Sequence, residues 1–272
     1  MSKGHVLQHQ AHHVVLGLAC PGPSAAPKPF LLRLIENHAL AAVASTLTVD
    51  AVHVWCFEYR REQRRAPLLD VLGAYLGIEG AEVALVEGDF GRPELSPRHG
   101  MTLDFNWSHS GERALIAVAQ GVAPGVDIER VQERPRAVQI ADRYFLPAET
   151  AALSALDGAA RSAAFLQLWT AKEAILKALG RGIAFGLDRL EIGGSQQQPT
   201  LLRLDGEDPG QWQLRRLDVG VGYLGALAWR GTSRVIDCQF LGASPQDSAG
   251  GNLASARLRQ LRRWTGAGRS GT

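Results

Sequence analysis

The sequence predicts an α+β fold built around antiparallel sheet, and composition and patterning both support this. The chain has 272 residues, of which 46% are hydrophobic and 21% charged, and its mean hydropathy is −0.06. These values are typical of a globular chain that buries its own core. Helical and strand-like patterns occur in separate blocks, whereas a doubly wound parallel sheet would alternate them.

The first regular block begins at Ala51. Residues 52–57 are rich in β-forming side chains and predict a strand. Residues 61–76 place apolar side chains at helical spacing, and Pro67 indicates that the regular helix begins close to it. Residues 1–50 show no comparable pattern, so we treat them as an N-terminal segment of unknown role.

Two further strands are predicted at residues 101–107 and 114–119. The polar run Ser108 to Gly111 separates them and predicts a hairpin with His109 at its tip.

A short strand is predicted at residues 126–129, directly after the turn Pro124-Gly125. Asp127 and Glu129 stand two positions apart on it, so their carboxylates share one face about 7 Å apart along the strand.

The second half of the chain contains a helical block followed by a block of strands. Gly180 follows the last helix, as a C-terminal glycine should. The expected helices are 137–144, 148–156 and 161–179, and the expected strands are 187–192, 200–204, 212–217, 223–229 and 234–240.

Charge and cysteine usage exclude several classes of protein. The net charge is +2, but residues 241–272 hold five arginines and one aspartate, so the rest of the chain carries −2 and does not resemble a nucleic-acid binder. The cysteines Cys20, Cys56 and Cys238 have neither zinc-site nor disulfide-scaffold spacing. No window has the roughly 18 uncharged apolar residues of a spanning helix. We therefore expect a cytoplasmic protein without nucleic-acid or membrane partners.

Four side chains could perform chemistry together. Glu173 and Lys177 share a helix face at i, i+4. With Asp127 and Glu129 they suit Mg²⁺ and a phosphorylated substrate, because carboxylate oxygens bind this ion and an ammonium group neutralises phosphate charge. The alternative is that the strand carboxylates are solvated and that Glu173 and Lys177 form a surface ion pair.

Four motifs follow one another along the chain. Residues Gly125 to Glu129 (GVDIE) are followed 40 residues later by Trp169 to Lys177 (WTAKEAILK). Upstream lie Phe105 to Ser110 (FNWSHS) and Gly91 to Pro93 (GRP). In this order the motifs resemble those of the 4′-phosphopantetheinyl transferases, and every specified position of that family's paired signature matches.

The resemblance covers about residues 52–240, at the length of the surfactin-activating, pseudo-dimeric type. It implies two similar halves related by a pseudo-twofold axis, each a small antiparallel sheet with packed helices, with CoA and Mg²⁺ in the cleft between them. The halves are then residues 51–124 and 125–240, and residues 241–272 form a flexible basic tail. A pseudo-dimer completes its own cleft, so a monomer is expected.

The resemblance also implies a role for each motif residue. Asp127, Glu129 and Glu173 hold the metal, Glu173 also deprotonates the attacking serine, and Lys177 acts on the phosphate charge. The implied CoA-binding residues are Arg65, Arg92, Ser108, His109 and Lys172, with Ser108 and His109 at the 3′-phosphate.

The activity implied is transfer of 4′-phosphopantetheine from CoA to a serine of an acyl or peptidyl carrier protein, in secondary metabolism. Three alternatives remain: a Mg²⁺-dependent phosphohydrolase, a non-catalytic relative that binds CoA or a carrier protein, and an interaction protein with coincidental motifs. The stretch between the first strand and the basic helix start at Arg60 is shorter than is usual in the family. Trp169 is expected to pack in the core with Phe165.

Overall fold

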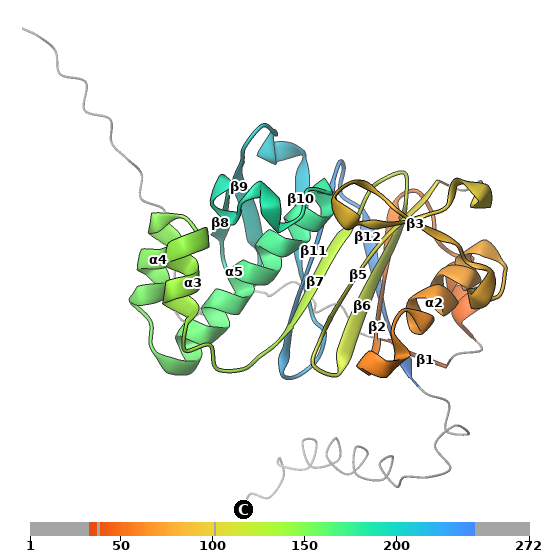
Figure 1. Cartoon of the computed structure of the whole chain (residues 1–272), viewed down its shortest axis with the longest axis horizontal. Coiled ribbons are helices and arrows are strands. Elements are labelled where there is room, and N and C mark those ends of the chain that lie inside the picture. Colours follow the sequence, from red (N-terminus) through yellow and green to blue (C-terminus); the bar gives the residue numbers. More distant parts are fainter. Residues whose placement is uncertain (1–32, 37–38, 101, 243–272) are drawn as a thin grey trace, which may run out of the picture.

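The computed structural model describes residues 33–36, 39–100 and 102–242 (Figure 1). The expected basic tail lies almost wholly outside these residues, as does most of the segment 1–50. The described helices are α1 Leu40–Ala44, α2 Ala66–Leu76, α3 Ala137–Tyr144, α4 Pro147–Ser154 and α5 Gly158–Leu179. The described strands are β1 Arg33–Glu36, β2 Ala51–Glu58, β3 Leu85–Glu87, β4 Pro93–Leu95, β5 Leu103–Ser110, β6 Arg113–Gln120, β7 Gly125–Arg130, β8 Leu190–Gly194, β9 Pro199–Leu204, β10 Trp212–Leu217, β11 Tyr223–Arg230 and β12 Val235–Gly242.

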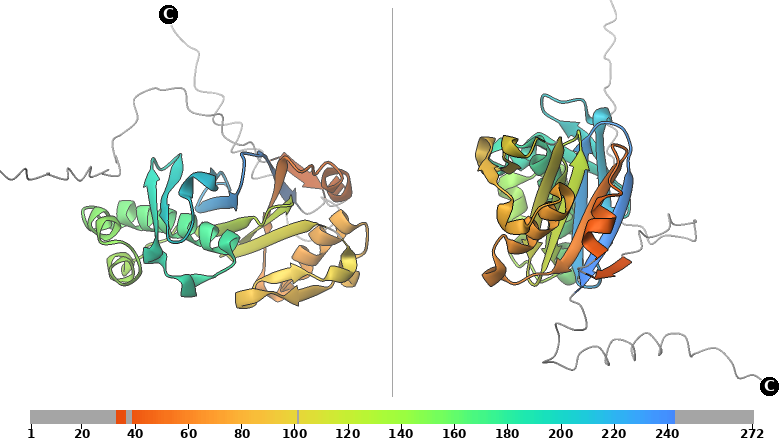
Figure 2. Two further views of the ribbon diagram at one scale, coloured as in Figure 1. Left: turned by 90° about the horizontal axis from the view of Figure 1, so that it is seen from above. Right: turned by 90° about the vertical axis from the view of Figure 1, so that its right-hand side faces the viewer.

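The α+β prediction is confirmed. The strands form a five-stranded sheet in the order β1-β12-β2-β6-β5, a three-stranded sheet β10-β11-β7, and the hairpins β3-β4 and β8-β9. Helices α3 and α4 lie at one end of the molecule and α2 at the other, while α5 packs against β7 and β11 (Figures 1 and 2).

The expectation of purely antiparallel sheets is wrong for the larger sheet. Strand β12 runs parallel to both β1 and β2, whereas the three-stranded sheet is antiparallel throughout. A parallel neighbour requires a long crossover, and here the whole of residues 59–234 separates β2 from β12. Strand patterning does not encode pairing direction. The division at residue 124 and the pseudo-twofold relation remain proposals.

The predicted hairpin is confirmed, but its tip is not at His109. Strand β5 continues to Ser110, and His109 pairs with Ala114 of β6 inside the ladder. The turn lies at Gly111, whose φ of +58° favours glycine. Ser108 and Ser110 point to one face of β5 and hydrogen-bond to Asp127 and Glu129, whereas His109 contacts Tyr59 and Trp107. Polar side chains that are satisfied by tertiary contacts of this kind give a strand the composition of a turn.

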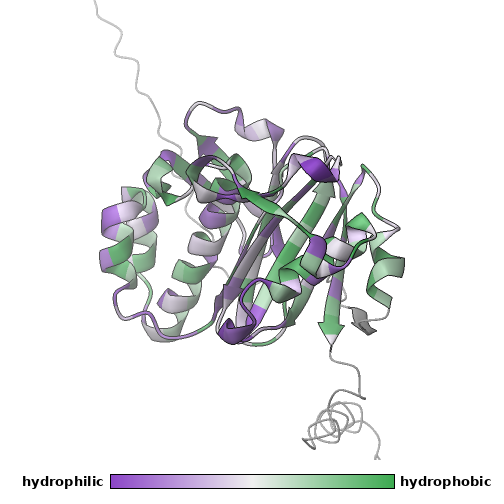
Figure 3. Cartoon of the chain, turned by 45° about the vertical axis from the view of Figure 1, so that its right-hand side comes forward, coloured by the Kyte–Doolittle hydropathy of each residue, from purple (hydrophilic) through white to green (hydrophobic). Residues whose placement is uncertain are grey.

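Three buried clusters stabilise this arrangement. One lies between α5 and the small sheet, and a second lies beneath α2. The third contains residues of both sheets, among them Val54, Leu115, Ile128 and Trp229, so the two sheets share a core. The hydrophobic residues of the central strands are visible in Figure 3. No helix in the described part of the chain is long and apolar enough to cross a membrane.

Candidate active site

The predicted carboxylates and lysine meet where β5, β7 and α5 come together. Gly125 permits this approach, because a Cβ there would lie 2.1 Å from the carbonyl oxygen of Ala174 and 2.3 Å from the amide nitrogen of Ala178. Strand β7 lies beside β5, where the Val126 amide donates to Asn106 Oδ1 at 2.9 Å. The helix face carrying Glu173 and Lys177 is thereby brought over Asp127.

Asp127 is the centre of this cluster and is 5% exposed. Its Oδ1 accepts from Ser108 Oγ at 2.8 Å and from Lys177 Nζ at 2.6 Å. Lys177 also donates to the Val126 carbonyl at 3.1 Å. The alternative of a mere surface Glu173–Lys177 pair is therefore wrong: Lys177 binds Asp127.

Glu129 is held by two other groups. Its Oε2 accepts from Ser110 Oγ at 2.9 Å and from the Arg134 guanidinium at 3.1 Å. Burial and the nearby charge of Asp127 raise the pKa of Glu129, while Ser110 and Arg134 act against the rise. Sequence reasoning missed Arg134, for which the one signal was its position shortly after the GVDIE motif.

Glu173 is 8% exposed, and its Oε1 is buried without a hydrogen-bond partner. Burial, followed by the charge of Asp127, raises the pKa of Glu173 to about 7. Asp127 Oδ2 is also buried without a partner. Buried oxygens are normally satisfied, so two orphaned carboxylate oxygens in one cluster indicate a missing partner of positive charge.

The donor chemistry fits Mg²⁺, although the geometry of a complete protein cage is lacking. In the described part of the chain, no group of three or more His, Cys, Asp and Glu side chains is arranged to hold a metal ion. Mg²⁺ usually takes one or two carboxylates and completes its shell with water and substrate phosphate. Asp127 Oδ2 and Glu173 Oε1 could supply two such oxygens, and the Oε1 of Glu129 could supply a third.

His109 is exposed beside this cluster and contacts aromatic rings. Its ring centroid lies 4.8 Å from that of Tyr59 and 5.4 Å from that of Trp107. Burial and the positive charges of Arg61 and Lys177 lower the pKa of His109. This edge of the site is therefore cationic, which suits an anion such as phosphate.

Comparison with known proteins is consistent with this chemistry. A profile of the 4′-phosphopantetheinyl transferase superfamily (ACPS) matches residues 123–228. The 4′-phosphopantetheinyl transferase HetI of Nostoc sp. is 36% identical over 171 residues, which cover 60% of this chain and 72% of HetI. The chain belongs to the 4′-phosphopantetheinyl transferase family.

Two further similarities have lower coverage. A Synechocystis protein with the provisional name 4′-phosphopantetheinyl transferase is 35% identical over 150 residues, so the chain spans 61% of that relative's length and 55% of its own. The crystal structure of Thermotoga maritima holo-[acyl-carrier-protein] synthase matches over 41% of this chain and 64% of the synthase chain. The two share 22% sequence identity over this match, with a TM-score of 0.33. A TM-score this low supports no conclusion about the present fold.

Lys172 of the transferase signature does not lie at the site, which corrects the expectation that it binds CoA. It is 0% exposed. Its Nζ donates to the carbonyls of Leu187 at 2.8 Å and Leu190 at 2.7 Å and forms an ion pair with Glu149 at 2.8 Å. Lys172 and Glu173 are neighbours in sequence, but successive helical residues point about 100° apart. Lys172 therefore faces the core beneath α4 and β8.

Arg92 of the GRP motif is also engaged by protein groups. Its guanidinium donates to the carbonyls of Lys177, Phe105 (3.0 Å) and Pro124 (3.1 Å), and burial lowers its pKa. It thus ties the β3-β4 hairpin to β5, to the start of β7 and to the last turn of α5. These bonds use three of the five N–H donors of the guanidinium, so contact of Arg92 with a CoA phosphate remains a proposal. Its bond to the Lys177 carbonyl also makes it a positioning residue for the last turn of α5.

Arg65 and Trp169 complete the predicted residues. Arg65 is exposed just before α2 and has no ion pair or side-chain hydrogen bond within the described residues, so its CoA contact remains a proposal. Trp169 packs against Phe165 at 5.8 Å between ring centroids, as expected. It also lines a small pocket beside Glu129 and Arg134.

Proposed function

We propose that this chain transfers the 4′-phosphopantetheine group of CoA to a serine hydroxyl of an acyl or peptidyl carrier protein. The observation that supports this most is the meeting of Asp127, Glu173 and Lys177 beside the cationic edge at His109. Such a site offers charge neutralisation and positioning, which phosphoryl transfer needs more than covalent help.

In this reaction the serine oxygen attacks the phosphorus next to the pantetheine arm. A new P–O bond forms, the bond to adenosine 3′,5′-bisphosphate breaks, and Glu173 takes the serine proton. Lys177, fixed by Asp127 and by the backbone, neutralises phosphate charge as it develops. Ser108 donates to Asp127, and we expect His109, with Arg61 nearby, to bind the 3′-phosphate.

We further propose that the reaction depends on Mg²⁺ held by Asp127 and Glu173. When bound, the ion would neutralise charge on the phosphate oxygens. Glu129 could join as a third ligand through Oε1, because its bonds to Ser110 and Arg134 both use Oε2. The enzyme is proposed to act as a cytoplasmic monomer in secondary metabolism.

The test is to incubate the full chain with CoA, Mg²⁺ and an apo acyl carrier protein, or an apo peptidyl carrier domain, and to weigh the carrier. Transfer adds the phosphopantetheine arm, a gain of about 340 Da. The matched control is Lys177→Ala under the same conditions. Release of inorganic phosphate with no mass gain would instead identify a phosphohydrolase. CoA binding without turnover would identify a non-catalytic relative.

A further inference from the structure

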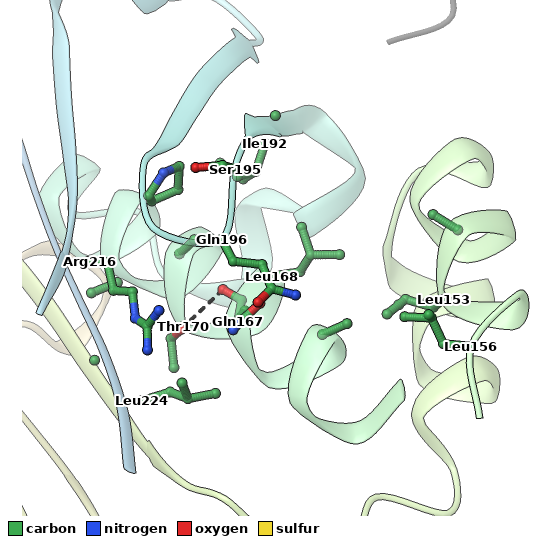
Figure 4. A pocket seen from close by; sticks show the side chains of 17 residues that line it. Leu153, Leu156, Gln167, Leu168, Thr170, Ile192, Ser195, Gln196, Arg216 and Leu224 are labelled. Atoms are coloured by element: carbon green, nitrogen blue, oxygen red, sulfur yellow. Dashed lines mark hydrogen bonds between the residues drawn. The ribbon is translucent and has the colours of Figure 1, made fainter. Parts of the chain in front are cut away.

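A second pocket lies beside α5 (Figure 4). Ala164, Leu168 and Ala171 line it at i, i+4 and i+7, which places them on one helix face. Glu173 comes two residues after Ala171 and so points about 200° away from that face. The pocket is therefore separate from the proposed CoA site.

The walls of this pocket are mainly apolar. Leu153 comes from α4, Leu156 from the turn after it, Leu224 from β11, and Ile192 and Pro199 from the β8-β9 hairpin. The neutral polar side chains that line it are Gln167, Thr170, Ser195 and Gln196. The space between these walls, about 720 Å³, includes open solvent. Small-molecule sites commonly combine apolar walls of this kind with a few polar groups.

Arg216 of β10 is the single charged side chain among the described residues that line the pocket. It is half-buried, and no described residue forms an ion pair or hydrogen bond with its guanidinium. Its neighbour Arg215 differs, since that guanidinium donates to Gln213 Oε1 at 2.7 Å and to the Leu214 carbonyl at 2.9 Å. A half-buried, unpaired cation favours an anionic partner that compensates its lost hydration.

The arrangement of these groups selects the shape of a ligand. In Figure 4, Arg216 extends toward Thr170 and Gln167 at one side of the pocket, while Leu153 and Leu156 lie at the other. A planar carboxylate matches one guanidinium through two parallel hydrogen bonds. A phosphate dianion would leave one negative charge unpaired beside a single arginine.

We propose that this pocket binds a linear aliphatic carboxylate of medium chain length. Its carboxylate pairs with Arg216, and its chain lies against Leu168, Leu153 and Leu156. The binding is non-covalent and independent of phosphopantetheine transfer.

The experiment measures binding of sodium decanoate to the full chain by isothermal titration calorimetry. Arg216→Gln should weaken binding about tenfold or more, whereas Arg215→Gln, the matched loss of charge, should change it less than about twofold. Decan-1-ol should bind the wild type as weakly as decanoate binds Arg216→Gln. Ala164→Leu, which fills the apolar wall, should also weaken binding, and thermal unfolding of each variant checks its fold.

Three results would overturn the proposal. One is the absence of saturable binding up to about 1 mM decanoate, and another is an equal loss in the Arg215 and Arg216 variants. The third is competition between decanoate and CoA, which would place the carboxylate in the other site.

Discussion

Replacing Lys172 by methionine tests whether this signature lysine stabilises the fold or contacts CoA. Methionine retains most of the apolar volume and removes the ammonium group. The change leaves the carbonyls of Leu187 and Leu190 without their donor and leaves Glu149, which is 4% exposed, without its counter-ion. Breaking a buried ion pair by removing one partner costs about 3–5 kcal/mol.

The assay is equilibrium unfolding in urea. With a slope of about 2–3 kcal/mol/M, the Lys172→Met midpoint should fall by about 1–2 M. Adding Glu149→Gln should restore part of this loss, because the amide oxygen still accepts from the Leu146 or Ile192 amide and no buried charge remains. KM for CoA, corrected for the folded fraction, should stay at the wild-type value.

The opposite pair of results would contradict a structural role for Lys172. An unchanged urea midpoint together with a KM for CoA raised about tenfold would show that Lys172 faces the ligand.

Three further changes test the site. Asp127→Asn should lower the transfer rate about 10²-fold or more, because it removes the charge that fixes Lys177. The urea midpoint should fall less than in Lys172→Met, because the amide oxygen can still accept from Ser108 and Lys177. Near wild-type transfer in Mg²⁺ would contradict this, and Ser108→Ala is the milder control. Arg92→Lys should lower kcat with little change in KM for CoA, because one ammonium group cannot replace the guanidinium that donates to three carbonyls. A raised KM for CoA with an unchanged kcat would instead indicate that Arg92 contacts a phosphate of CoA. In the free protein the pKa of His109 is lowered, and a phosphate partner would raise it, so CoA binding should take up a proton and weaken as pH rises through the bound-state pKa. Calorimetry in buffers of different ionisation enthalpy measures this proton uptake. The uptake should disappear in His109→Gln and when 3′-dephospho-CoA replaces CoA. Proton uptake that persists in His109→Gln would exclude His109 as the group that binds the 3′-phosphate.

Periodicity predicted the local elements well, because it depends only on neighbouring residues. The helix at 161–179 and the strand carrying Asp127 both formed, and Glu173 and Lys177 were expected on one helix face. The direction of strand pairing was not predictable, because nothing in the sequence of β12 specifies that it pairs with β2 or that the two strands run parallel.

Side-chain direction limited the prediction of the site. The family resemblance implied that Lys172 binds CoA, but the helical rotation between Lys172 and Glu173 directs Lys172 into the core. Arg92 was expected at a phosphate because of its charge, whereas its hydrogen bonds are to main-chain carbonyls from three separate segments. Such contacts depend on tertiary packing.

The position of β12 between β1 and β2 has a consequence for synthesis on the ribosome. Until residues 235–242 have emerged, β2 pairs only with β6, and its other edge offers free main-chain groups. The larger sheet is therefore finished last, although β2 is among its first strands to be made. A fragment ending near residue 124 would keep that edge open and tend to aggregate, and addition of the remaining chain in trans should rescue it by supplying β12.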